Sequence, residues 1–286
     1  MCWSFEVSVA FALIEVASIA FISLRAKRTK DPYVRAQVWV IPLLVTILLV
    51  EIAEAFIWLD TTLLPITAKD GPSCSSYNRN WTFVFWFLMF PWQPLFCIIP
   101  CRRVGHPRNK DVFAAAEVVA WGLPILHILV YLGQVIPQSM NPNFSPAPPR
   151  LKIQQNAMQT FINSETCTYI GKNGHLFWTL ATADCWATPN MSVYVILCLA
   201  MLCAKPKRFF AGIGLAMGGL VIALNSYYNG TVETASMWCW TGILVHFYFI
   251  AQPYVLPCND ENCFSPNTFA TASSLPETKA FLEKGT

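Results

Sequence analysis

Two acidic residues three positions apart lie inside an apolar stretch that is long enough to cross a bilayer as a helix. Glu51 and Glu54 belong to the segment 41–59 (IPLLVTILLVEIAEAFIWL). A spacing of three places both carboxylates on one helical face, and Trp58 extends that face by another turn. Because an ionised carboxylate is costly inside a bilayer, acidic residues there usually serve a function. The pair therefore predicts a site for protons, a small cation or a polar cationic solute.

Two carboxylates at this spacing repel each other when both are ionised. One of them should then keep its proton, unless a cation binds between them. The structural alternative is that Glu51 and Glu54 are partly protonated and form hydrogen bonds with neighbouring helices. We take the functional interpretation for this pair, and the structural one for each histidine in the apolar segments.

Other polar residues fall at comparable depths in the apolar segments. With about 1.5 Å of rise per residue, they lie in the outer half of the bilayer or near its midplane, whereas Glu117 falls near the inner surface. Glu6 and Glu15, in the first apolar segment, are also ionisable but are not assigned to this group. An outward-opening polar cavity would collect the predicted binding residues, which are Glu51, Glu54, Trp58, Gln93, His127, Asp184, Asn225 and His246.

The composition predicts an all-helical protein that crosses a membrane several times. Hydrophobic residues make up 55% of the 286 residues and charged residues only 12%, which is too apolar for an ordinary soluble domain. The fifth apolar stretch is interrupted by Pro189 and polar neighbours, so it predicts one kinked helix or a re-entrant piece followed by a shorter span; six helices are the main alternative. The seven predicted spans are 3–24, 37–59, 81–100, 112–136, roughly 176–204, 209–228 and 237–256.

The basic residues predict the orientation of these spans. Most of the 19 Lys and Arg residues lie in the connections after the first, third and fifth stretches, and short loops rich in Lys and Arg stay on the cytoplasmic side. The amino terminus is therefore expected outside and the carboxyl terminus inside. Residues 1–256 form the predicted membrane domain, and residues 257–286 a flexible cytoplasmic tail.

The predicted outer connections contain candidate sites of covalent modification. Cys74 and Cys167 lie in the two longest of them, so they are the expected disulfide pair; Cys2 and Cys239 are rival partners, and free thiols are the alternative. The sequons that begin at Asn229 and Asn143 are candidate glycosylation sites; their residues are Asn229, Thr231, Asn143 and Ser145.

A GxxxG pattern occurs in the sixth apolar stretch. Gly214 and Gly218 fall on one helical face, which predicts close packing between helices. A homodimer through the same face is the sharper hypothesis. The other expected partners are the lipid bilayer and a small cation or polar solute, whereas nothing in the sequence supports nucleic-acid binding.

Several cofactor-dependent and catalytic chemistries fit the sequence poorly. A retinal protein needs a lysine inside a helix, and every lysine lies outside the predicted spans or at their ends. A haem could use only His127 and His246, and a membrane-embedded zinc hydrolase would add Asp184 and Glu54 without any HxxxH spacing. No cofactor is therefore expected, and an enzyme is the less favoured class.

Short motifs in a fixed order carry a family resemblance. They are Met-Cys-Trp-Ser at the start, Glu54-Ala-Phe-Ile-Trp58-Leu-Asp60, then Cys74 and Asn78, Gln93-Pro94, and Ser236-Met-Trp-Cys239. Over the membrane core, this order resembles an uncharacterised family of multi-helix membrane proteins of protists and large DNA viruses. The resemblance implies a seven-helix membrane domain without an established activity, and it draws attention to Glu54, Trp58, Asp60 and Gln93.

We therefore expect a transporter-like or channel-like protein for protons or small cations. A seven-helix ligand-sensing receptor is the first alternative, since an outside amino terminus and an inside tail fit that class. A membrane-embedded metal-dependent hydrolase is the second.

Overall fold

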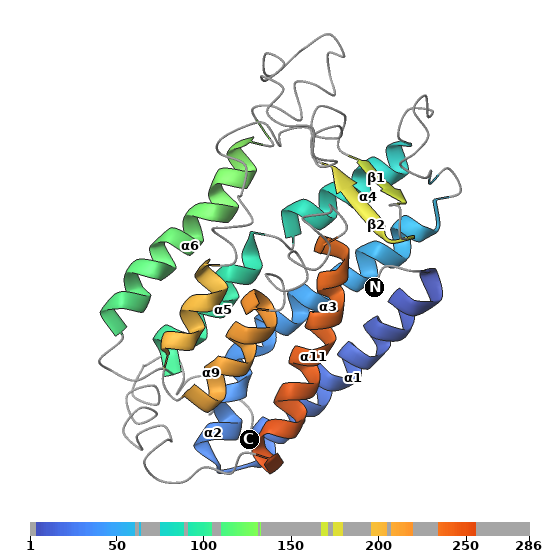
Figure 1. Ribbon diagram of the computed structural model, residues 1–286. Coiled ribbons are helices and arrows are strands. Elements are labelled where there is room, and N and C mark those ends of the chain that lie inside the picture. Colours follow the sequence, from blue (N-terminus) through green and yellow to red (C-terminus); the bar gives the residue numbers. More distant parts are fainter. Residues whose placement is uncertain are drawn as a thin grey trace, which may run out of the picture.

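The computed structural model describes residues 4–60, 63, 75–88, 91–104, 110–130, 132, 167–170, 174–179, 196–204, 207–219 and 234–255. Over these residues the chain is mostly helical, with one two-stranded antiparallel sheet (Figure 1). The elements are α1 (Phe5–Arg28), α2 (Pro32–Ala36), the 3-10 helix η1 (Gln37–Val40), α3 (Ile41–Trp58), α4 (Ser76–Leu88), α5 (Trp92–Val104), α6 (Lys110–Val130), β1 (Cys167–Ile170), β2 (Leu176–Thr179), the 3-10 helix η5 (Ala200–Cys203), α9 (Lys207–Gly214), the π-helix η6 (Leu215–Gly219) and α11 (Thr234–Val255).

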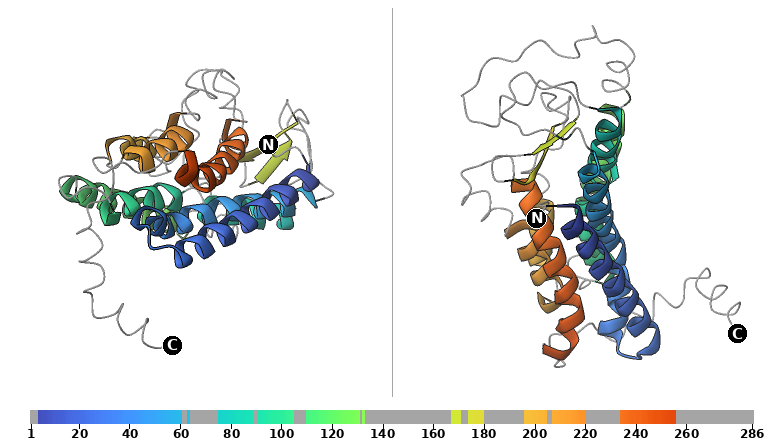
Figure 2. Two further views of the ribbon diagram at one scale, coloured as in Figure 1. Left: turned by 90° about the horizontal axis from the view of Figure 1, so that it is seen from below. Right: turned by 90° about the vertical axis from the view of Figure 1, so that its right-hand side faces the viewer.

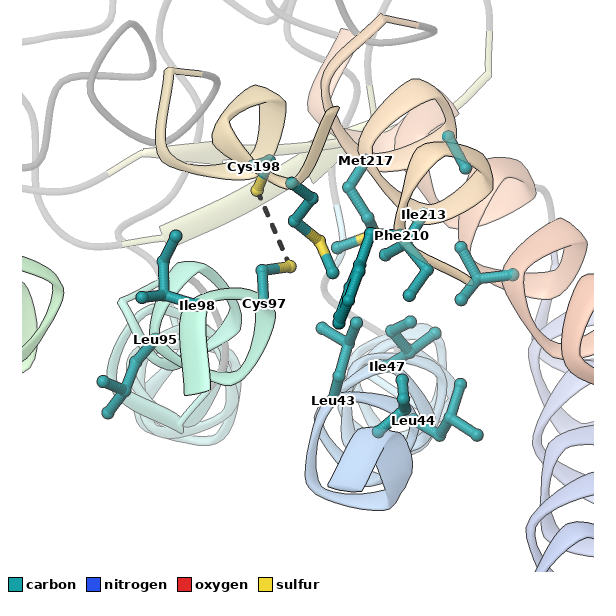
Figure 3. Close-up of a cluster of buried hydrophobic side chains, with 14 of the residues drawn as sticks. Leu43, Leu44, Ile47, Leu95, Cys97, Ile98, Cys198, Phe210, Ile213 and Met217 are labelled. Carbon is teal, nitrogen blue, oxygen red and sulfur yellow. Dashed lines mark hydrogen bonds between the residues drawn. The ribbon is translucent and has the colours of Figure 1, made fainter. Parts of the chain in front are cut away.

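The long helices form two layers. Seen from below in Figure 2, α6, α5, α3 and α1 follow one another in a row, and α9 and α11 lie against one face of that row. The core lies between the layers, where Leu43 and Ile47 of α3 face Phe210 and Ile213 of α9 (Figure 3). All four side chains are fully buried. This two-layer packing places α11 beside both α1 and α3.

Two of the described helical stretches are long and apolar enough to cross a membrane, judged by length and composition. They are α1 and the continuous stretch Tyr33–Trp58, which joins α2, η1 and α3. Large apolar side chains are exposed on the outer faces of α1 and α6, among them Leu13 and Val118. Such faces suit contact with lipid.

Two predicted spans differ from the observed elements. The stretch 81–100 is divided between α4 and α5, and Pro91 lies at the break, where its ring interrupts the helical hydrogen-bond ladder. The expected helix from residue 176 is wrong at its start, because Leu176–Thr179 forms strand β2 and pairs with β1. A four-residue apolar run does not distinguish a strand from a helix by periodicity. Gly174, with φ of 80°, lies two residues before β2.

An arginine of α1 binds carbonyl groups of α11 at the end of the bundle away from the sheet. Pro253 has no backbone N–H, so the Phe249 carbonyl four residues earlier loses its partner within the helix. The Arg25 guanidinium donates to that carbonyl at 2.6 Å and to the Ile250 carbonyl at 2.9 Å. It also donates to Gln37 Oε1 at 2.7 Å, and Gln37 Nε2 donates to the Phe249 carbonyl at 3.1 Å. This network joins α1, η1 and α11.

Other helix ends with basic residues lie near the same place. The Arg103 guanidinium, at the end of α5, is 5.9 Å from the centre of the Trp39 ring in η1. Tyr33 of α2 and Phe209 of α9 are in edge-to-face contact, with ring centres 5.6 Å apart. The end of α1, the end of α5 and the start of α9 therefore share one end of the bundle, as the predicted topology requires; which side of a membrane it faces stays a prediction.

The opposite end is held by the side chain of Asn78 in α4. Its Oδ1 accepts a hydrogen bond from the Thr168 N–H at 2.8 Å, and its Nδ2 donates to the Thr168 carbonyl at 2.9 Å. The Thr82 and Thr168 hydroxyls are 2.6 Å apart. Ser75 Oγ accepts from the Asn78 N–H at 3.0 Å and donates to Asp60 at 2.6 Å. These bonds attach β1 to α4 and α4 to the segment after α3.

Cys167, in the same strand, is disulfide-bonded. Its expected partner Cys74 lies outside the described residues, so the identity of the pair stays a prediction. The candidate glycosylation sites Asn143 and Asn229 and the tail 257–286 also lie outside them.

We expect Arg25→Met to lower the free energy of unfolding by about 2 kcal/mol, because hydrogen bonds to charged groups contribute about 1.5–3 kcal/mol and buried carbonyls would lose their donor. Denaturant-induced unfolding in detergent micelles measures the change. Arg28→Met, an exposed arginine in the same last turn of α1, is the control and should change stability little. Equal effects of both substitutions would contradict the role of the Arg25 network.

Candidate functional site

A glutamate and a histidine from opposite ends of the sequence meet inside the bundle. Glu15 of α1 and His246 of α11 are both fully buried, and Glu15 Oε1 lies 3.9 Å from His246 Nε2. That separation is too long for a hydrogen bond but within ion-pair distance, so the two groups attract each other when the glutamate is ionised and the imidazole is protonated. The imidazole ring also contacts the backbone of Leu44 in α3. His246 therefore lies where α1, α3 and α11 come together.

The predicted glutamate pair lies on α3, the helix that packs against α1. Glu51 and Glu54 are both fully buried in α3. Glu54 is close enough to Glu15 for the charges of the two carboxylates to interact. We call Glu15, Glu51, Glu54 and His246 the acidic cluster. It brings three carboxyl groups and one imidazole from three helices into the interior.

Helical spacing explains how α1 presents its polar groups inward. Its buried face runs through Ser8, Glu15, Ser18 and Ile22, at intervals of three, four and seven residues. Ser18 Oγ donates to the Ile14 carbonyl at 2.7 Å, which satisfies that hydroxyl within its own helix. Glu15 has no such local partner on α1: neither of its carboxylate oxygens forms a hydrogen bond among the described residues. Its carboxylate is therefore available to partners on other helices.

A glycine lets α11 approach α3 beside the cluster. A Cβ atom on Gly242 would lie 2.6 Å from Cγ2 of Ile47, closer than such atoms pack. Gly242 precedes His246 by one helical turn, so both lie on the same face of α11. The missing side chain of Gly242 thus allows the close packing that carries His246 to Glu15 and Leu44.

The cluster holds more potential negative charge than positive charge. His246 supplies one positive charge at most, against three carboxyl groups. Arg25 is ten residues beyond Glu15 on α1, which is about 15 Å of helix, and it is engaged with carbonyls of α11. Because charge is costly in an apolar interior, these four groups are suited to taking up protons or a cation.

The other predicted binding residues are distributed as follows. Gln93 is buried near the start of α5, the neighbour of α3, and Trp58 is partly buried at the end of α3. His127 belongs to α6, which lies at the far end of the row from α1 (Figure 2), and its side chain is outside the described residues. Asp184 and Asn225 also lie outside them.

Glu15 is the member of the cluster that the sequence analysis left unassigned. Glu6, the other acidic residue of the first apolar segment, is exposed at the start of α1. A signal was present in the spacing of Glu15, Ser18 and Arg25, which places three polar residues on one helical face. That face is the one that α1 turns toward α3 and α11.

Among the described residues, no group of three or more His, Cys, Asp or Glu side chains is positioned to hold a metal ion. For those residues, the predicted zinc hydrolase has no supporting ligand set.

The predicted packing role of Gly214 fits the structure, because a Cβ there would meet Leu202 at 3.1 Å and the Cys198 carbonyl at 3.3 Å in the same chain. Dimerisation through Gly214 and Gly218 stays a prediction.

The fold and the cluster define a mostly helical protein with two helices that could span a membrane. The chain is similar to the uncharacterised protein R287 of Acanthamoeba polyphaga mimivirus, with 24% identity over 261 residues, which cover 89% of this chain and 96% of the viral protein. This distant likeness is consistent with the expected link to large DNA viruses. No family model matches the chain, and no solved structure matches it.

The contact between Glu15 and His246 predicts energetic coupling in a double-mutant cycle. We expect Glu15→Gln and His246→Gln to show a coupling energy of about 0.5–3 kcal/mol, the range for residues in contact. Unfolding of the wild type, both single variants and the double variant gives this quantity. Glu6→Gln combined with His246→Gln is the matched control, since Glu6 is exposed near the start of α1. Additive effects of Glu15→Gln and His246→Gln would show that the two groups do not interact.

Proposed function

We propose that this chain is a multi-pass membrane protein that binds and moves protons or small cations through its acidic cluster. The observation that carries the proposal is that Glu15 lies beside His246 and within electrostatic range of Glu54. The three residues come from three different helices and are fully buried. A purely structural role would be served by neutral hydrogen-bonding groups at a smaller cost. Ionisable groups are suited to taking up and releasing positive charge.

The depths of the carboxylates support entry from the end of the bundle that holds the sheet. Glu54 lies about 6 Å from the end of α3, while Glu15 lies about 15 Å from the start of α1 at the same end. A proton or cation arriving from there meets Glu54 before Glu15 and His246. In the proposed topology of seven spans with the amino terminus outside, this end faces outward.

The opposite end is closed by the Arg25 network. The guanidinium group and Gln37 occupy the carbonyl groups next to Pro253, and a fixed positive charge there opposes the passage of cations. Passage inward would therefore require Arg25 to leave those carbonyls, and the proline-interrupted part of α11 provides a bend point for that movement. Binding of positive charge in the cluster and release of Arg25 would then alternate.

The experiment measures proton and cation flux in proteoliposomes that contain the purified chain, with a pH-sensitive dye inside and defined gradients of H⁺, Na⁺ and K⁺. We expect flux from the wild-type protein. Glu15→Gln and the double variant Glu51→Gln with Glu54→Gln should each reduce the initial rate at least about tenfold, which corresponds to about 1.4 kcal/mol of lost stabilisation. Glu6→Gln should retain the wild-type rate.

All variants are compared only after size-exclusion chromatography and unfolding confirm that they fold. If no gradient drives flux through the wild-type protein, or if the variants of the cluster transport at the wild-type rate, the proposal is wrong. In the first case ligand binding by a receptor becomes the leading alternative.

A further inference from the structure

A second group of reactive side chains lies away from the acidic cluster, between α5 and the helical segment that leads into η5. Cys97 and Cys198 point toward each other, with their sulfur atoms 4.0 Å apart (Figure 3). Both side chains are fully buried, and both are thiols without a disulfide. Since they are separated by 101 positions in the sequence, their contact depends on the tertiary fold.

Each helical segment carries another sulfur on the same face. Cys101 follows Cys97 by one turn of α5, and its Sγ donates to the Cys97 carbonyl at 3.2 Å. Met201 follows Cys198 by three residues, at the spacing of helical neighbours. Cys101 is 1% exposed and Met201 is 0% exposed. Two segments thus contribute two buried sulfur atoms each.

The surroundings of this sulfur group are apolar. Figure 3 shows the two thiols within a cluster of buried hydrophobic side chains that includes Leu43, Ile98, Phe210 and Met217. Buried cysteines often serve only as small apolar residues. A ligand that binds between the two thiols must form a neutral complex with them, because the apolar surroundings offer nothing to compensate a net charge. A tetrahedral zinc site is not supported, since it needs four ligands and the described residues contain no group of three His, Cys, Asp or Glu placed for a metal.

We propose that Cys97 and Cys198 bind one soft monovalent metal ion of the Cu(I) class, flanked by Cys101 and Met201. Thiolate and thioether sulfur select Cu(I) among biological metals. Two metal–sulfur bonds of about 2.3 Å span at most about 4.6 Å, so an ion fits between sulfurs 4.0 Å apart with little movement. A disulfide would require the sulfurs to approach to about 2.05 Å, which demands a larger shift of the two segments.

The chemistry of binding balances without an oxidant. One thiol loses its proton to solvent and its sulfur bonds the metal ion, so that Cys–SH and M⁺ give Cys–S–M and H⁺. The second thiol keeps its proton and binds through a sulfur lone pair. The charge of one thiolate cancels that of the ion, and the buried complex is neutral. Cys203, five residues after Cys198, is an exposed thiol of the same segment.

The test uses the full chain in detergent micelles, reduced with a phosphine and kept free of oxygen. Cu(I) is supplied as its bicinchoninate complex, and retained copper is measured after desalting. We expect one copper per chain in the wild type and at least a tenfold lower retention in the double variant Cys97→Ser with Cys198→Ser. Cys203→Ser is the matched control, because it removes an exposed thiol of the same segment, and it should retain copper.

Copper retention that is absent in the wild type, or unchanged in the double variant, would overturn the proposal. A Cys97–Cys198 disulfide that forms on mild oxidation of a chain unable to retain copper would also overturn it and would indicate a redox pair instead. If the double variant does not fold, X-ray absorption of the copper-loaded wild type gives an independent test: sulfur atoms as the only direct ligands support the site, and nitrogen or oxygen ligands exclude it.

Discussion

The Phe249 carbonyl group is the point on which the arrangement of the helices depends. Pro253 removes its partner within α11, and in an apolar environment a carbonyl without a donor costs several kcal/mol. Arg25 and Gln37 both supply the missing hydrogen. Satisfying that group fixes α1 against α11 and η1 against both. Once this end is fixed, the same face of α1 carries Glu15, ten residues away, to the level of His246.

The acidic cluster therefore follows from a structural requirement at one end of the bundle. Close packing is the second condition, because Gly242 allows α11 to approach Ile47 of α3 and brings His246 between the two layers. Within the acidic cluster, three carboxyl groups stand against one imidazole. Positive charge can be stored there only if it arrives from outside the cluster. This is a property of the charge balance, and it holds for a transporter and for a sensor alike.

Much of the helical structure could be predicted from hydropathy, because a bilayer requires long apolar segments that satisfy their own backbone. The burial of Glu51 and Glu54 on one face also follows from local spacing. The partner of Glu15 could not be predicted, since pairing between helices far apart in the sequence leaves no periodic signal. Strand β2 was missed for a different reason: four apolar residues fit either conformation, and the bonds from Asn78 to Thr168, which hold β1 in place, are long-range contacts.

The hydrogen bond from Arg25 to Phe249 joins groups 224 positions apart. During synthesis of the proposed multi-pass membrane protein, α1 would leave the ribosome long before α11, and Glu15 would lie in the translocon or the lipid without His246. Glu15 would lack His246, and Arg25 would lack the two carbonyl groups of α11, until α11 arrives. The packing of α11 against α1 would then be the last step of assembly. A chain truncated before α11 would leave Glu15 without His246 and would be degraded by membrane quality control.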